Sequence, residues 1–106
     1  MKESVFQKDA IKLIESLGGY VIKTHVSAYQ SQGEPDLVCC YKGYFVAFEL
    51  KIPGNKPSEL QKLKMNKIQR AGGTAIAAYS LKDIEVILNE ISRIQQHSQP
   101  DERQML

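Results

Sequence analysis

Two carboxylates and one lysine are the residues of this sequence whose types and spacing could do chemistry. Asp36 is followed by Glu49 and Lys51, and the pair Lys42-Gly43 between them indicates a tight turn. If this pair forms a two-residue hairpin turn, residues face each other when their numbers sum to 85, so Asp36 faces Glu49. Because side chains alternate along a strand, Lys51 lies on the same face as Glu49. The hairpin therefore predicts all three side chains at one end of one sheet face.

The chemistry that fits this arrangement is metal-assisted hydrolysis. Two carboxylates that face each other at ~5 Å repel by about 3 kcal/mol at an effective dielectric constant of ~20. A divalent cation between them reverses this cost, because Mg²⁺ binds one or two carboxylates together with waters and phosphate oxygens. The lysine can then hold the attacking water or offset the charge that develops on the phosphate.

Two alternatives stay open in the sequence. Asp36 could simply begin a strand while Glu49 and Lys51 form an exposed ion pair, although the apolar run around Glu49 disfavours this because a buried glutamate without a partner is costly. The hairpin is the second open point. A type I′ turn prefers Asn or Gly at its first central position, so a longer or bulged loop around Lys42 is the alternative.

The elements that must position these residues follow from the spacing of apolar residues. The pattern predicts helices over 3–17, 58–71 and from 81 onward, and strands over 20–26, 35–41, 44–51 and 74–79. Strand 44–51 is apolar on both faces, which is typical of a covered central strand. Ser58 and Gln61 have the form of a capping box. The predicted fold class is α/β, with the element order α-β-β-β-α-β-α.

Length and composition indicate one small domain. The chain has 106 residues and a formal net charge of +2, so net charge alone identifies no partner. We expect a single domain over 1–97 and a polar tail over 98–106. Cys39 and Cys40 are adjacent and cannot pair without strain, so both are expected to be buried thiols in a reducing compartment. With neither an apolar run of about 18 residues nor a signal peptide, the chain is predicted to be cytoplasmic with no membrane contact.

The surroundings of the motif resemble a known family. Pro35-Asp36 and, after a hairpin, Glu49-x-Lys51 resemble the PD-(D/E)xK nuclease superfamily, whose restriction-endonuclease-like fold has a central mixed sheet flanked by helices. The wider pattern is similar to the VRR-Nuc family, in particular its short stand-alone members from phage and bacterial genomes. That pattern consists of Gly33-x-Pro35-Asp36-Leu37, Gly43, Glu49-x-Lys51, Ser58-x-x-Gln61 and Ala71-Gly72-Gly73. The resemblance extends from residue 3 to about residue 80.

The resemblance implies a role for each matching residue. Asp36 and Glu49 match metal ligands for Mg²⁺ or Mn²⁺, and the backbone carbonyl of Leu50 matches a third. Lys51 matches the catalytic lysine, and Gln61 matches a glutamine near the active site. A role for Gln61 in the capping box alone is an equally weighted alternative, and the two roles are compatible.

Further candidates come from the first helix and from the distribution of charge. Glu3 lies where the family places an acidic residue that reaches the metal, and a merely solvated terminus is its alternative. Between Lys51 and Arg70 there are six basic residues against one acidic residue, a surplus that fits a nucleic-acid backbone or, alternatively, a solvated helix face. The candidate DNA-binding residues are Lys56, Lys62 and Tyr29.

The predicted function is that of a Mg²⁺- or Mn²⁺-dependent endonuclease that hydrolyses phosphodiester bonds in DNA. By analogy with similar small nucleases, we expect a homodimer that acts on branched DNA such as Holliday junctions, in the host cytoplasm if the chain is phage-encoded. One alternative is a catalytically inactive nucleic-acid-binding domain of the same fold. Another is an α/β interaction protein in which Asp36 and Glu49 have no chemical role.

Overall fold

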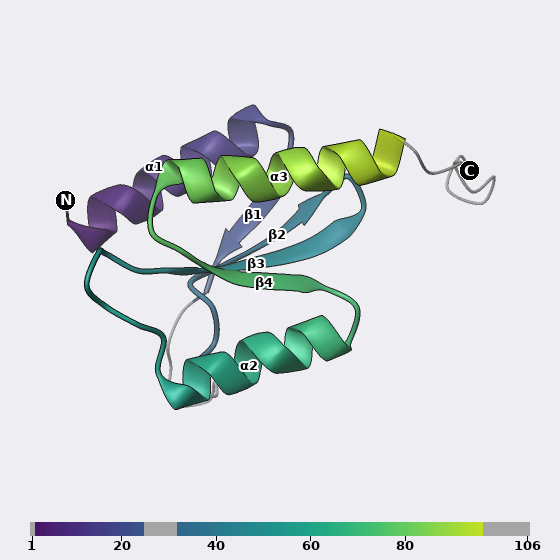
Figure 1. The fold of residues 1–106 in the computed structure, drawn as a ribbon. Helices are drawn as coiled ribbons and strands as arrows, with labels where there is room; N and C mark the ends of the chain where they lie inside the picture. Colours follow the sequence, from purple (N-terminus) through teal and green to yellow (C-terminus); the bar gives the residue numbers. More distant parts are fainter. Residues whose placement is uncertain (1, 25–31, 97–106) are drawn as a thin grey trace.

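A four-stranded sheet with helices on both faces makes up the computed structural model, which describes residues 2–24 and 32–96. The elements are α1 (Glu3–Ser16), β1 (Tyr20–Lys23), β2 (Leu37–Tyr41), β3 (Tyr44–Leu50), α2 (Glu59–Arg70), β4 (Thr74–Ala78) and α3 (Leu81–Gln96). The spatial order is β1-β2-β3-β4; β2 is antiparallel to both β1 and β3, whereas β4 is parallel to β3. Figure 1 shows α1 and α3 on one face of the sheet and α2 on the other. The predicted restriction-endonuclease-like α/β fold is confirmed.

The hairpin between β2 and β3 has the predicted register. The paired residue numbers sum to 85 along both strands, and the last pair before the turn is Tyr41 with Tyr44. Lys42 has a φ of 50° and Gly43 a φ of 86°, which are the two positive values that a type I′ turn requires. Lys42 adopts this left-handed conformation at a cost of about 1 kcal/mol. The two-residue turn is therefore correct, and the longer loop is excluded.

The hydrophobic core lies between the sheet and the layer formed by α1 and α3. Alternate residues of β2 and β3 point to this side, so Leu37, Val46, Phe48 and Leu50 are buried there. The helices contribute apolar side chains at helical spacing, namely Phe6, Ala10, Ile14, Ile84, Leu88 and Ile91. Burial of one large apolar side chain contributes about 1.5–3 kcal/mol, so this layer supplies most of the hydrophobic stabilisation.

The helix α2 lies against the opposite face and buries none of its own residues. It begins after the N-cap Ser58, whose Oγ accepts a hydrogen bond from the Gln61 N–H at 3.1 Å. Gln61 Oε1 in turn accepts a hydrogen bond from the Ser58 N–H at 2.8 Å, which completes the predicted capping box. Because α2 packs on β3 and β4, it leaves Tyr20 and Ile22 of β1 exposed on this face.

The two cysteines differ from the expectation that both are buried. Cys39 points into the core, where burial, together with the neighbouring Cys40 thiol, raises its pKa to about 11. Cys40 is exposed, because alternation along β2 directs it to the α2 side of the sheet. Both are free thiols.

Two other predictions lie partly outside the described residues. β1 ends at Lys23, and positions 25–26 of the predicted strand are not described; neither is the predicted boundary between domain and tail at 97–98. Among the described helices, none combines the length and the hydropathy needed to cross a bilayer.

Candidate active site

The end of the β2–β3 hairpin brings the two predicted carboxylates together. Glu49 lies in β3 on the α2 side of the sheet and is 2% exposed. Asp36 lies one residue before β2 and is partly buried. Its Oδ2 accepts a hydrogen bond from the Leu50 N–H at 2.8 Å, so Asp36 reaches along β3 past the position directly opposite Glu49. The two carboxyl groups remain close enough for the charge of Asp36 to act on Glu49.

Glu49 has donors at one of its two oxygens. Its Oε1 accepts a hydrogen bond from Gln61 Nε2 at 3.0 Å and lies 3.7 Å from Lys51 Nζ. Its Oε2 is buried and has no hydrogen-bond donor among the described residues. A buried carboxylate oxygen without a donor is costly to a fold, and it is also free to bind a cation.

The protonation of Glu49 reflects this environment. Burial raises the pKa of Glu49 to about 8, and the charge and hydrogen bond of Asp36 act in the same direction, while Lys51 opposes them. Without a cation the Asp36–Glu49 pair therefore retains one proton at neutral pH. Because metal binding requires ionised carboxylates, a divalent cation would release that proton.

Gln61 makes the contacts that both of its candidate roles require. Its Oε1 is occupied by the Ser58 N–H, so the capping box fixes the orientation of the amide and directs Nε2 toward Glu49. The start of α2 and the buried carboxylate are thus joined through one side chain. The capping signal in the sequence and the resemblance to an active-site glutamine describe the same residue.

The oxygen atoms at this site fit a hard divalent cation. The Leu50 N–H points to the Asp36 side of β3, and the carbonyl of a strand residue points to the same side as its N–H, so the Leu50 carbonyl is directed there too. Two carboxylates and a carbonyl are the ligand types of Mg²⁺ and Mn²⁺. No group of three His, Cys, Asp or Glu side chains that could hold a metal occurs among residues 2–24 and 32–96. Glu3, exposed in the first turn of α1, is therefore not gathered with Asp36 and Glu49.

The segment that carries Asp36 is fixed from two sides. Thr24 Oγ1, just after β1, donates a hydrogen bond to the Pro35 carbonyl at 2.6 Å, and the Thr24 N–H donates to the Asp36 carbonyl at 2.9 Å. From the other side, Lys64 Nζ of α2 lies 3.0 Å from Glu34 Oε1, with its side chain only 16% exposed. Neither the Thr24 hydrogen bonds nor the Lys64–Glu34 ion pair was predicted from the sequence.

A close approach of two backbones adds to the second anchor. Gly33 has a φ of 86°, and a Cβ at this position would lie 2.6 Å from Leu60 Cγ. Only glycine fits there, so α2 and the segment of Asp36 are in direct contact. The sequence holds one signal for the ion pair between Lys64 and Glu34. Lys64 follows Gln61 by three residues, and side chains at this spacing lie on the same face of a helix, which here is the face toward the site.

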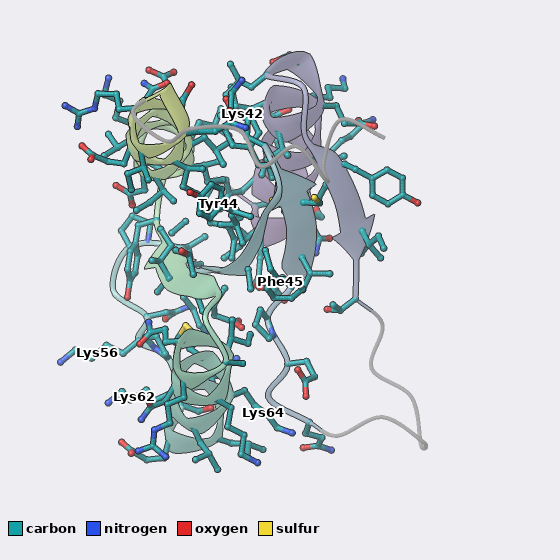
Figure 2. The ribbon with its side chains drawn as sticks, turned by 90° about the vertical axis from the view of Figure 1, so that its right-hand side faces the viewer. Lys42, Tyr44, Phe45, Lys56, Lys62 and Lys64 are labelled. Carbon is teal, nitrogen blue, oxygen red and sulfur yellow. The ribbon has the colours of Figure 1, made fainter. Side chains whose placement is uncertain are left out.

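The predicted DNA-binding lysines lie on one side of the molecule. Figure 2 shows Lys56 and Lys62 projecting on the same side, whereas Lys64 projects on the opposite side of α2. Lys56 is exposed in the loop after β3, and Lys62, 56% exposed, lies 3.3 Å from the exposed carboxylate of Glu59. Lys64 is neutralised by Glu34, so it does not belong to a solvated basic face. Tyr29 lies outside the described residues.

Two solved structures are similar to this chain over most of its length. A structure described as a VRR_NUC domain has a TM-score of 0.69 and 27% sequence identity, over 82% of this chain and 94% of its own. A structure described as a VRR_NUC domain protein has a TM-score of 0.62 and 20% identity, over 92% of this chain and 88% of its own. No family model and no curated protein matches the sequence.

The first of these structures, at 27% identity, supports the placement of the chain in the VRR-Nuc family, and the PD-(D/E)xK motif at Asp36, Glu49 and Lys51 is consistent with that family. The second, at 20% identity, shows the fold alone. The first structure and the motif together indicate a nuclease domain.

Proposed function

We propose that the chain is an endonuclease that hydrolyses phosphodiester bonds in DNA and depends on Mg²⁺ or Mn²⁺. The observation that carries the proposal is the buried Oε2 of Glu49, which has no donor among the described residues although Asp36 lies beside it. A divalent cation held by Asp36, Glu49 and the Leu50 carbonyl would supply the positive charge that this site lacks. It would orient and acidify a water next to the scissile phosphate.

The protein side chains around this position have separate tasks. Lys51 Nζ, 3.7 Å from Glu49 Oε1, can hydrogen-bond the attacking water or offset the charge that develops on the phosphate. Gln61 Nε2 holds Glu49 in one orientation. Lys56 and Lys62 are exposed on one side and can bind the flanking phosphates.

We also propose that the substrate is branched DNA and that the chain acts as a homodimer. Support for self-association comes from apolar side chains on the sheet face that α2 leaves uncovered: Tyr20 is 70% exposed, Ile22 51% and Phe45 48%. Adjacent exposed apolar side chains favour association. Light scattering at micromolar concentration should show about twice the 11.9 kDa of one chain, and a species of monomer mass alone would exclude the dimer.

The first experiment is cleavage of a labelled DNA panel that contains a Holliday junction, a flap, a duplex and a single strand. Wild type and Lys51→Ala are incubated with each DNA and either Mg²⁺ or Mn²⁺. We expect metal-dependent cleavage that is strongest on a branched DNA and is lost in the variant.

The same panel separates the alternatives. If wild type and Lys51→Ala bind DNA equally and neither cuts, the chain is a binding domain. If neither protein binds DNA, calorimetry with Mn²⁺ decides whether the carboxylates hold a cation. Unchanged heats in Asp36→Ala would mean that they do not.

A further inference from the structure

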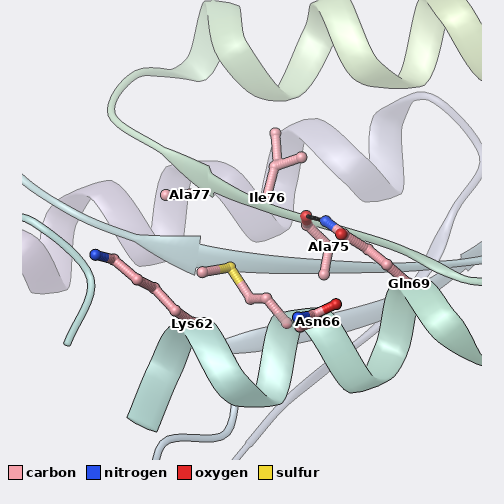
Figure 3. Close-up of a pocket in the computed structure, with 7 residues that line it drawn as sticks. Lys62, Asn66, Gln69, Ala75, Ile76 and Ala77 are labelled. Carbon is pink, nitrogen blue, oxygen red and sulfur yellow. Dashed lines mark hydrogen bonds between the residues drawn. The ribbon is translucent and has the colours of Figure 1, made fainter. Parts of the chain in front are cut away.

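A groove lies between α2 and the edge strand β4. It has a volume of about 510 Å³. Figure 3 shows Lys62, Asn66 and Gln69 of α2 on one side of it, with Ala75 and Ala77 of β4 on the other. Among the described residues that line it, Lys62 is the only charged one, and none of them is a carboxylate that would repel an anion. Its ion pair with Glu59 is exposed and exchanges readily with other partners.

The groove begins at the candidate active site. Ala77 pairs with Glu49 across β3 and β4, and both side chains lie on the α2 face of the sheet. Lys62 directly follows Gln61, whose amide contacts Glu49. From Lys62 to Gln69 the helix rises about 10 Å, which corresponds to about three stacked nucleotides. A strand that leaves the site toward α2 therefore enters the groove.

The floor of the groove carries polar groups but does not fit an added β-strand. Ala78 bonds to β3, through its carbonyl and the Lys51 N–H, so alternation directs the N–H and carbonyl of Ala77 outward. The next outward carbonyl, that of Ala75, already accepts a hydrogen bond from Gln69 Nε2 at 2.9 Å. This bond interrupts the edge that an extended peptide would need. Separate donors at the Asn66 amide, the Ala77 N–H and Lys62 Nζ suit a ligand with phosphates and base edges.

We infer that the α2–β4 groove binds a single-stranded nucleic-acid segment that flanks the scissile phosphate. Lys62 binds a phosphate, and the Asn66 amide hydrogen-bonds a base edge, for which amide side chains are well suited. The inference rests on the proposed nuclease function and extends it. It assigns to the chain a subsite for the single-stranded arm of a branched substrate.

The test measures DNA binding by the Lys51→Ala variant, which is expected not to cleave the DNA during the measurement. Two DNAs share one branch point, and one of them carries an additional single-stranded arm of six nucleotides. We expect the arm to tighten binding. In this background Asn66→Glu should reduce the gain in affinity that the arm provides about tenfold. Asn66→Lys should increase this gain and make the slope of log affinity against log salt concentration steeper by about one unit.

The matched controls are Asn89→Glu and Asn89→Lys, which make the same changes at an exposed position of α3. These should shift the affinities of both DNAs equally. If the arm has no effect, or if the variants at 66 and 89 act alike, the subsite is wrong while the nuclease function stands.

Two further outcomes complete the test. If the wild-type protein neither binds nor cuts either DNA, the proposed function itself fails. In NMR spectra the Ala77 amide and the Asn66 side-chain amide should shift with the armed DNA and not with the armless one. Resonances that are unmoved by the armed DNA would exclude the groove as the path of the strand, whatever else it binds.

Discussion

The two faces of the sheet are built in different ways. The face under α1 and α3 is apolar, and Phe48, Leu50 and Leu88 are fully buried there. The face under α2 carries Glu49, the buried charged residue of the described chain, and the helix above it has no buried residue. Polar contacts join α2 to the sheet and to the segment before β2, namely the Gln61–Glu49 and Gln69–Ala75 hydrogen bonds and the ion pair with Glu34.

This difference means that one face of the sheet stabilises the fold and the other carries the candidate active site. The packed face stabilises the fold by burial, which does not depend on charge. The other face can then accommodate a buried glutamate, a groove and exposed cations, which a tightly packed core does not tolerate. Substitutions on the two faces should therefore have different consequences.

The largest expected effect is on activity and arises on the α2 face. Lys51→Ala should lower DNA cleavage at least about 10³-fold, because the group that offsets transition-state charge is lost, while the free energy of unfolding changes by less than about 1 kcal/mol. Lys82→Ala on α3, which breaks an exposed ion pair with Glu85, is the matched control and should retain full activity. Equal losses in both variants would remove Lys51 from the active site.

On the packed face the effect is on stability. Phe48→Ala should lower the free energy of unfolding by about 3–5 kcal/mol, because it leaves a cavity in the core. Leu63→Ala on α2, at a side chain that is 49% exposed, should cost about 0.5 kcal/mol. Urea denaturation measures both, and similar values for the two variants would contradict the division between the faces.

The buried glutamate makes stability depend on pH in the metal-free protein. Because the folded state raises the pKa of Glu49 to about 8 from an ordinary value of 4.5, the folded state holds the proton more tightly than the unfolded state does. The contribution of Glu49 to the free energy of unfolding should therefore be largest at low pH and fall by up to ~4 kcal/mol between about pH 4.5 and pH 8. Glu49→Gln should flatten this part of the profile, and an unchanged slope would exclude Glu49 as its source.

The same proton should oppose binding of the cation. Calorimetry with Mn²⁺ should show an affinity that increases from pH 6 to pH 8, with close to one proton released per cation at the lower end. Repeating the titration in buffers of different ionisation enthalpy counts the protons. Proton release that persists unchanged in Glu49→Gln would assign it to another group.

A smaller effect is expected from the anchor between α2 and the segment of Asp36. Lys64→Met should cost about 1 kcal/mol of stability and weaken Mn²⁺ binding severalfold, because Glu34 loses its partner beside Asp36. Lys62→Met breaks only the exposed pair with Glu59 and should leave Mn²⁺ affinity unchanged. Equal affinities in the two variants would mean that the anchor does not position the carboxylates.

The smallest effect concerns the turn at the far end of the hairpin. Lys42→Asn should stabilise the fold by about 0.5 kcal/mol, because asparagine tolerates a φ of 50° better than lysine does. Cleavage should not change, since the turn lies at the opposite end of β3 from Glu49. A change in activity would show that the turn and the site are linked.

Local rules were sufficient to predict most of the fold. The register of the hairpin follows from a two-residue turn and a side-chain period of two, and the start of α2 follows from its capping box. The proximity of Asp36, Glu49 and Lys51 is a consequence of that register. The exposure of Cys40 was not predicted. Alternation along a strand predicts that the two cysteine side chains point to opposite faces of the sheet, but it does not predict how far α2 covers one of those faces.

The contacts of α2 were harder to predict for a physical reason. The Glu34–Lys64 ion pair, the close approach of Gly33 to Leu60 and the groove all depend on where α2 crosses the sheet. A helix that buries no residue has only a weak apolar stripe to specify this crossing, so polar contacts that no periodicity records help to set its position.

Gln61 contacts both Ser58 and Glu49, so the first turn of α2 should respond to the charge of Glu49. When Glu49 ionises, its hydrogen bond from Gln61 Nε2 becomes charge-assisted and stronger, and the capping box that shares this side chain is held more firmly. The backbone N–H of Gln61, which bonds to Ser58 Oγ, is then released less often. The hydrogen-exchange protection factor of the Gln61 N–H should rise over the pH range in which Glu49 loses its proton. Exchange of this helix amide would thus depend on the charge of a carboxyl group in the sheet.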